Sequence, residues 1–267
     1  MDRQQLWKRI RQVWITAGLV FTVVFTVWSL IAYRASDDAK AAIVSDPDVL
    51  VQYDGGVWSF SRDSVSNADD LPALVFFPGA LVDPVAYAPL ARAVAAAGYP
   101  AFIIEIPRRA AFGGATSPEL RTRLTRVLTQ PTTPRRWVAA GHSRGAVVAS
   151  DVAASSPAGL SGVVLIGSSH PRDVDLSGLH VPVAKIVGTR DGLASREEVE
   201  ANRGKVPVST RWEWIEGGNH SQFGWYGFQP GDRPATIDAE TQRATMIRVM
   251  LEVLAGIAHA NASVPSA

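Results

Sequence analysis

Short apolar runs alternate with amphipathic segments along most of the chain, and this alternation predicts its secondary structure. Strand-like runs, most of them apolar, lie at residues 73–77, 99–106, 137–140, 162–166, 183–187 and 210–215. Hydrophobic positions recur with helical spacing at residues 84–97, 117–130, 144–155, 195–202 and 237–259. Residues 49–60 contain Gly55 and Gly56 between two β-rich runs and predict a hairpin. The pattern is typical of an α/β fold, with helices on both faces of a mostly parallel central sheet.

The N-terminal region has a different pattern, an apolar segment over residues 13–33 that contains no charged side chain. As a helix it would be roughly 31 Å long, about the thickness of the hydrocarbon core of a bilayer. The preceding residues 1–12 include four basic side chains: Arg3, Lys8, Arg9 and Arg11. This charge distribution predicts a basic cytoplasmic tail and one transmembrane helix, with the rest of the chain on the extracytoplasmic side of the cell membrane.

Two other interpretations of residues 13–33 fit less well. A cleaved secretory signal has a shorter apolar region that ends in an A-x-A-like site, and a buried core helix would have to be apolar on every face. We therefore expect an uncleaved, single-pass signal anchor. The polar, alanine-rich residues 34–47 are interpreted as a linker, and residues 48–267 as one globular domain.

The composition narrows the possible functions. The 267 residues contain 26 Lys and Arg against 25 Asp and Glu, so the chain lacks the basic excess of a nucleic-acid-binding protein. There is no cysteine, which excludes disulfides, thiolate zinc sites and a thiol nucleophile. We expect neither a metal nor a cofactor, and the sequence leaves the oligomeric state open.

The candidate nucleophile lies between the expected strand at 137–140 and the helix that follows it. Gly141-His142-Ser143-Arg144-Gly145 matches the G-x-S-x-G pattern of a sharp strand-to-helix turn. Such a turn projects the serine Oγ above the carboxyl edge of the sheet, where ligands bind in open parallel sheets. Ser143 is therefore the expected nucleophile.

A serine hydroxyl needs a base, and the base needs an orienting acid. Asp191 follows the expected strand at 183–187, and His220 follows the strand at 210–215. The order Ser, Asp, His is the one expected for this arrangement of strands. Asp173 and Asp175, on the loop after the preceding strand, are the alternatives for the acid.

An oxyanion that forms during attack on a carbonyl needs backbone N–H donors. Arg144, directly after the candidate nucleophile, is one expected donor. The other is Ala80 or Leu81, in the turn that follows the strand at 73–77.

Four segments together resemble the α/β-hydrolase family, in particular its bacterial branch similar to dienelactone hydrolases: Phe77-Pro78-Gly79-Ala80, Gly141-His142-Ser143-Arg144-Gly145, Gly188-Thr189-Arg190-Asp191-Gly192 and Gly217-Gly218-Asn219-His220-Ser221-Gln222-Phe223-Gly224. The resemblance extends from about Asp48 to the end of the chain. It implies a serine hydrolase that works through an acyl-enzyme intermediate. Dienelactone hydrolases use a cysteine where this chain has Ser143, so their substrate does not follow from the resemblance.

The surroundings of the site suggest its substrate class. Only residues 167–182 separate two expected strands at the place where this fold often carries a lid, so we expect no sizeable lid. Arg108 and Arg109 could contact an anionic group, and Trp225 and Tyr226 could line an acyl pocket. A small-molecule carboxylic ester is the expected substrate. An acyltransferase, an amidase and a non-catalytic binding domain on the same scaffold are the alternatives.

Overall fold

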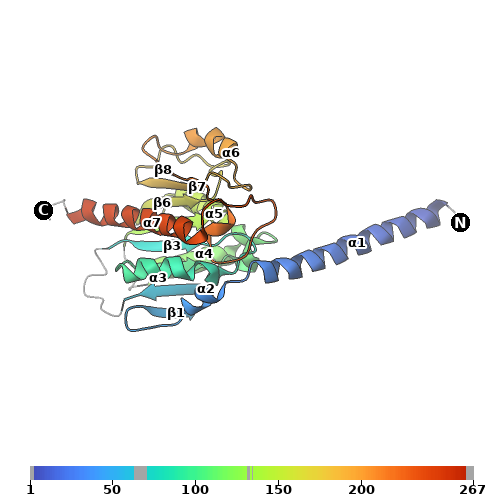
Figure 1. The fold of residues 1–267 in the computed structure, drawn as a ribbon, viewed down its shortest axis with the longest axis horizontal. Helices are drawn as coiled ribbons and strands as arrows, with labels where there is room; N and C mark the ends of the chain where they lie inside the picture. The colour runs from blue at the N-terminus through green and yellow to red at the C-terminus, as the bar shows by residue number, and fades with distance from the viewer. Residues whose placement is uncertain (1–2, 63–70, 131–132, 134, 263–267) are drawn as a thin grey trace.

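An eight-stranded sheet forms the centre of the domain in the computed structural model, which describes residues 3–62, 71–130, 133 and 135–262 (Figure 1). Its strands lie in the order β1-β2-β4-β3-β5-β6-β7-β8. Their bounds are β1 Leu50–Asp54, β2 Val57–Ser61, β3 Ala73–Phe77, β4 Ala101–Ile104, β5 Trp137–His142, β6 Leu160–Ile166, β7 Val183–Gly188 and β8 Arg211–Ile215.

The sheet is mostly parallel, as the sequence predicts. β1 and β2 form an antiparallel hairpin, and β2 also pairs antiparallel with β4, whereas every pair from β4 to β8 is parallel. Gly55 and Gly56 form the hairpin turn with φ of 48° and 83°, values that glycine adopts at little cost. The carboxyl ends of the parallel strands therefore lie along one edge, where the candidate site residues follow them.

Helices cover both faces of the sheet, and this fold class is confirmed. The α-helices are α1 Arg3–Ala32, α2 Asp37–Ala41, α3 Ala88–Ala96, α4 Pro118–Thr129, α5 Arg144–Ala154, α6 Arg196–Ala201 and α7 Ala239–Ala262. Short 3₁₀ turns are η1 Pro84–Tyr87, η2 Pro107–Ala110, η3 Gly114–Thr116, η4 Arg203–Lys205 and η5 Ser221–Phe223. The helix expected at 84–97 thus begins as a 3₁₀ turn, which Asp83 caps by accepting a hydrogen bond from the Val85 N–H.

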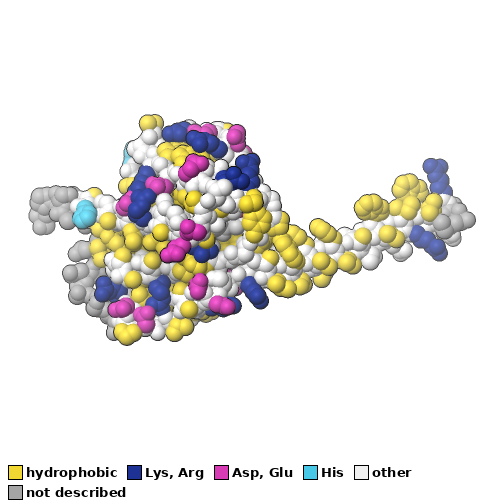
Figure 2. All heavy atoms as spheres, in the orientation of Figure 1, with side chains coloured by type: hydrophobic (Ala, Val, Ile, Leu, Met, Phe, Trp, Pro, Cys, Tyr) yellow, Lys and Arg dark blue, Asp and Glu magenta, His cyan; other side chains and the backbone are white. Residues whose placement is uncertain are grey.

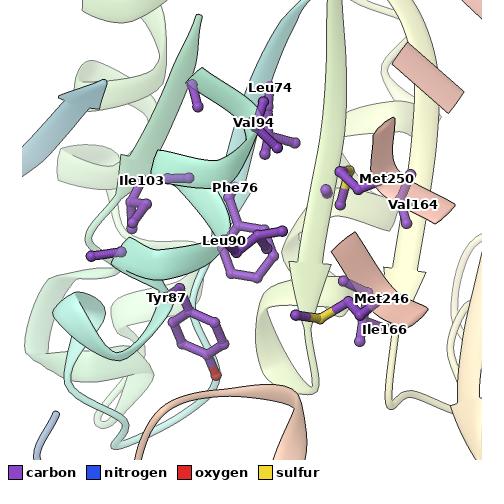
Figure 3. Packing of buried hydrophobic residues seen from close by; sticks show 14 of the residues in the cluster. Leu74, Phe76, Tyr87, Leu90, Val94, Ile103, Val164, Ile166, Met246 and Met250 are labelled. Carbon is purple, nitrogen blue, oxygen red and sulfur yellow. The ribbon is translucent and has the colours of Figure 1, made fainter. Parts of the chain in front are cut away.

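The core consists of two apolar layers, one on each face of the sheet, because successive side chains of a strand point to opposite faces. In β3, Leu74 and Phe76 pack with α3 and α7, whereas Val75 and Phe77 pack with α4 and α5. Figure 3 shows the first layer, where Leu90 of α3 and Met246 of α7 lie over the strands. Both layers immobilise the strand ends that carry the site.

The N-terminal helix differs from the expected boundaries at both ends. α1 begins at Arg3, so the described part of the basic tail expected over residues 1–12 is helical. Its Gln, Leu, Lys and Arg residues all have a high helix propensity. Most of α1 extends away from the domain with exposed apolar side chains (Figure 1). Within the described residues it is the one helix long and apolar enough to cross a bilayer, and its most apolar 18-residue stretch has a mean hydropathy of 2.1.

Part of the segment expected to be a linker, residues 34–47, forms a short helix and packs against the domain. Ser36 caps α2, and Ala35, Ala39 and Ala42 are buried in the core layer of α3 and α7. Ala39 on α2 and its C-cap Ala42 have the spacing of one helical face, and their small side chains allow this short polar segment to pack tightly onto the domain. Residues 33–42 are therefore part of the domain's packing.

The loop at the usual lid position is short and irregular. Residues 167–182 run between β6 and β7 without a helix or strand. The edge of the sheet that carries the candidate site is thus left without a helical cap from this segment.

Candidate active site

Ser143 occupies a sharp turn between β5 and α5. Its backbone has φ 54° and ψ −118°, a conformation that costs a non-glycine residue about 1–3 kcal/mol and is common at functional sites. The Ser143 N–H donates to the Ile166 carbonyl of β6 at 2.9 Å, which fixes the turn against the sheet.

The two glycines of the motif make this turn possible. A Cβ added to Gly145 would collide with the carbonyl oxygen of Phe77, and one added to Gly141 would collide with the backbone of Gly145. α5 therefore packs directly against the end of β3, and Ser143 stays at the edge of the sheet.

Asp191 and His220 form a buried pair although they come from different loops. His220 Nδ1 lies 2.9 Å from Asp191 Oδ2, and the two side chains are 2% and 0% exposed. Asp191 Oδ1 accepts hydrogen bonds from the N–H groups of Leu193 and Ala194 at 2.8 and 2.7 Å. The carboxylate is therefore held in one orientation and can accept a hydrogen bond from the Nδ1–H of His220.

The second ring nitrogen of His220 is available for chemistry. His220 Nε2 is buried and has no hydrogen-bond partner within the part of the chain that the structure describes. In the tautomer whose Nδ1–H donates to Asp191, Nε2 carries the lone pair of the ring. A buried, unpartnered base is the group needed to accept a proton from a nucleophile or a water molecule.

His142, the neighbour of Ser143, belongs to a separate buried network. Its Nδ1 lies 2.8 Å from the Tyr87 hydroxyl, which itself accepts a hydrogen bond from the Gly79 N–H at 3.2 Å. Burial holds the pKa of His142 well below its usual value, and the proximity of His220 lowers this pKa further. His142 is therefore neutral and places no positive charge beside His220, whose ring centroid is 4.5 Å away.

Asp232 supports the pair and escaped the sequence reasoning. Its carboxylate accepts hydrogen bonds from the N–H groups of His220 and Ser221 at 3.2 and 2.8 Å. It also accepts from the Ser221 hydroxyl at 2.7 Å and from the Gly192 N–H at 3.0 Å, so one carboxylate connects the loops of Asp191 and His220. No motif surrounds Asp232 in the sequence, and only the fold brings it to this position.

Gln242 of α7 has a related role. Its side chain accepts from the Asn219 N–H at 3.0 Å and donates to the Asn219 carbonyl at 2.6 Å. Asn219 directly precedes His220, so α7 also helps to fix the histidine loop.

The expected oxyanion donors are only partly compatible with the structure. Arg144 is the first residue of α5, so its N–H has no acceptor within the helix. Leu81 does not fit, because its N–H donates to the Arg109 carbonyl at 2.8 Å. Ala80 remains the candidate in this turn, since no hydrogen bond of its N–H is found among the described residues.

Three of the four residues expected to contact substrate have contacts within the protein. Arg109 lies 3.6 Å from Asp83 in an ion pair, whereas Arg108 is exposed. The Trp225 carbonyl accepts from the Ser36 N–H at 2.8 Å, and Tyr226 contacts Tyr33, so both aromatic residues lie against the segment that follows α1. A substrate role for these four residues stays a prediction.

The described residues contain no group of three or more His, Asp or Glu side chains arranged to hold a metal ion. The arrangement that stands out chemically is a strained serine turn and a buried Asp–His pair at the carboxyl edge of a parallel sheet. This combination is typical of α/β hydrolases.

Comparison with known proteins places the chain in that class. Residues 73–244, more than half of the chain, match the alpha/beta hydrolase family, and the chain belongs to this family. No curated protein matches the sequence.

Solved structures share the fold at low sequence identity. A ferulic acid esterase from Streptomyces cinnamoneus is similar with a TM-score of 0.56 and 17% identity, over 74% of this chain and 81% of that one. A dienelactone hydrolase-like promiscuous phosphotriesterase from metagenomic libraries has a TM-score of 0.54 and 18% identity, over 77% and 97%. An alpha-beta serine hydrolase homologue from Coxiella burnetii has a TM-score of 0.52 and 12% identity, over 79% and 99%. The expected resemblance to the hydrolase fold, including dienelactone-hydrolase-like members, is confirmed.

Proposed function

We propose that the protein is a membrane-anchored serine hydrolase that cleaves carboxylic esters through an acyl-enzyme intermediate. The observation that carries this proposal is the buried Asp191–His220 pair with its unpartnered Nε2, together with the strained turn at Ser143. The esterase and hydrolase folds among the similar structures are consistent with it.

In the proposed reaction, Ser143 Oγ attacks the ester carbonyl while His220 Nε2 accepts the hydroxyl proton. Asp191 orients the ring and stabilises the imidazolium. The Ala80 and Arg144 N–H groups donate to the oxyanion. His220 then returns the proton to the leaving alcohol, and the acyl group remains on Ser143.

Deacylation repeats the sequence with water as the nucleophile. His220 removes a proton from the water, the hydroxide attacks the acyl carbonyl, and the acid is released as Ser143 recovers its proton. The sum is one ester plus one water giving one acid and one alcohol, so no further reactant is needed.

The membrane part of the proposal rests on α1. Its apolar residues are exposed to the surroundings, as a helix in lipid requires, and the basic residues near its N-terminus favour a cytoplasmic start. The hydrolase domain then lies on the extracytoplasmic side of the cell membrane.

Ester hydrolysis by the full chain in detergent micelles tests the catalytic assignment. Ser143→Ala and His220→Gln should each lower kcat for a p-nitrophenyl ester by about 10⁴-fold or more, because the triad acts as a unit. Ser177→Ala and His180→Gln are matched controls at exposed positions. Activity that survives in the first two variants would contradict the proposal.

A further inference from the structure

The membrane helix enters the domain at the edge of the sheet that carries the candidate active site. Apolar side chains of α1 are exposed as far as Ile31, although Ser29 on another face of the helix is 1% exposed and Tyr33 is 5% exposed. The apolar surface of the helix thus extends to the point where the chain packs against the domain. Figure 2 shows the hydrophobic side chains of α1 continuing onto the adjoining domain surface.

The contacts at this junction involve the catalytic loops themselves. The Tyr33 carbonyl accepts a hydrogen bond from the Asp83 N–H at 2.9 Å, in the loop that follows β3. The Ala32 carbonyl lies so close to Gly227 that an added Cβ there would be 2.6 Å from it. Gly227 belongs to the loop that carries His220, so the helix is seated on both loops.

A row of aromatic rings leads from the membrane helix to the catalytic histidine. Tyr33 contacts Tyr226, Tyr226 contacts Tyr87, and Tyr87 contacts His142, with ring centroids 6.1, 6.4 and 5.9 Å apart. His142 in turn contacts His220. With no flexible linker between helix and loops, the distance between the bilayer and the site cannot vary freely.

Exposed apolar side chains lie on the same edge of the sheet. Phe112 is 81% exposed after β4, Leu193 is 41% exposed after β7, and Phe228 is 53% exposed after β8. Phe228 directly follows Gly227, the contact of Ala32. A hollow of about 480 Å³ adjoins this junction and is lined in part by Tyr226 and Phe228. Large apolar side chains exposed on the edge of the sheet that an apolar helix enters are expected to enter the membrane interface.

From these contacts we propose that the catalytic edge lies on the bilayer surface and that the substrates are long-chain acyl esters resident in that bilayer. The inference rests on the proposed hydrolase function and deepens it by naming the substrate class. The ester carbonyl of such a molecule lies in the interfacial region, at the level where α1 meets the catalytic loops. The acyl chain remains in the bilayer until the ester group reaches Ser143.

The chain offers a clean test of location because it contains no cysteine. Phe112→Cys places a single label site on the catalytic edge, and Val208→Cys places one before β8, toward the opposite edge, where Val208 is fully exposed. Each variant is labelled with bimane as the full chain in phosphatidylcholine vesicles that contain lipids brominated near the headgroup. We expect loss of most of the fluorescence at position 112 and unchanged fluorescence at 208. Equal quenching, or none, at the two positions overturns the proposed orientation.

A second measurement tests the substrate class. In the same vesicles, a membrane-resident long-chain ester should be cleaved with higher kcat/KM than a water-soluble butyrate ester that has the same leaving group. Phe112→Asn should lower the rate on the resident ester severalfold and leave the soluble ester unchanged, since asparagine accepts the φ of 46° at this position. Val208→Asn is the control. Equal preference for the two esters, or an equal loss on both in Phe112→Asn, overturns the substrate assignment.

Labelling by a fluorophosphonate separates the two proposals. If the wild type reacts at Ser143 but the quenching or the ester comparison gives the opposite result, the proposed hydrolase function stands. Only the proposal of a bilayer-resident substrate is then refuted. Folded wild type that does not react removes the hydrolase function itself.

Discussion

Lys185 is a buried lysine in the central sheet, and its effect on stability can be calculated. The side chain is 1% exposed, and its ammonium donates to the carbonyls of Ser168 and His170. No carboxylate lies within ion-pair distance of it in the described chain. Burial lowers the pKa of Lys185 from 10.5 to about 7.

This shift makes the stability of the fold depend on pH. Between about pH 7 and pH 10 the unfolded chain holds a proton that the folded chain has lost, so stability rises with pH by about 1.4 kcal/mol per unit. The full penalty, reached below pH 7, is about 5 kcal/mol. The fold therefore loses stability as the pH falls from the pKa of Lys185 in the unfolded chain to its pKa in the folded chain.

Lys185→Met removes this titration and is the perturbation to measure. The Ser168 and His170 carbonyls lose a donor, which costs about 1–3 kcal/mol each but does not change with pH. The difference in free energy of unfolding between wild type and variant should therefore change by about 1.4 kcal/mol per pH unit from pH 7 to pH 10.

Thermal unfolding of the full chain in detergent micelles gives the readout. For a domain of this size the Tm difference should shift by roughly 3–5 °C per pH unit. Lys40→Met, at an exposed position of α2, controls for removing a surface lysine. Parallel Tm curves for wild type and Lys185→Met over this range would refute the reasoning.

Three further predictions concern the site. Asp191→Asn should leave the fold intact and lower kcat by about 10⁴-fold, because an amide can hold the wrong tautomer of His220. Circular dichroism checks the fold and ester kinetics check kcat, and a near-normal kcat would contradict the prediction. Asp232→Ala should lower both Tm and kcat, with a loss in kcat of about tenfold or more from the misplaced histidine loop; a loss of stability without any loss of kcat would remove its positioning role. Gly145→Ala should abolish soluble folded protein because the added methyl group would collide with the Phe77 backbone. Gly178 has open space around it, so Gly178→Ala should leave expression and Tm unchanged.

The sequence was most informative where chemistry is local. The G-x-S-x-G turn needs its glycines within two residues of Ser143, so the motif and the flanking strand and helix are all visible in one short segment. Asp191 and His220 could be chosen because each lies within a few residues of the end of an expected strand. The structure brings this Asp and this His together at 2.9 Å.

Hydrogen bonds between loops that are far apart in the chain could not be predicted from the sequence. Asp232 lies in a long loop after β8, and its link to Gly192 exists only once both loops are folded. From the sequence, Leu81 is a reasonable oxyanion donor. In the structure its N–H donates instead to the Arg109 carbonyl, in the segment that follows β4.

The packing of the segment after α1 was hidden for a different reason. Its polar, alanine-rich composition is typical of a linker, but Ala35, Ala39 and Ala42 are buried. Ala39 on α2 and its C-cap Ala42 are three residues apart, a spacing that places both on one helical face.

Labelling of the full chain in detergent micelles with a fluorophosphonate, followed by mass mapping of the modified peptide, tests the central claim most directly. The account predicts one adduct, on Ser143, that disappears in Ser143→Ala and is strongly reduced in His220→Gln. Folded wild type without an adduct, or with the adduct on another serine, would contradict it.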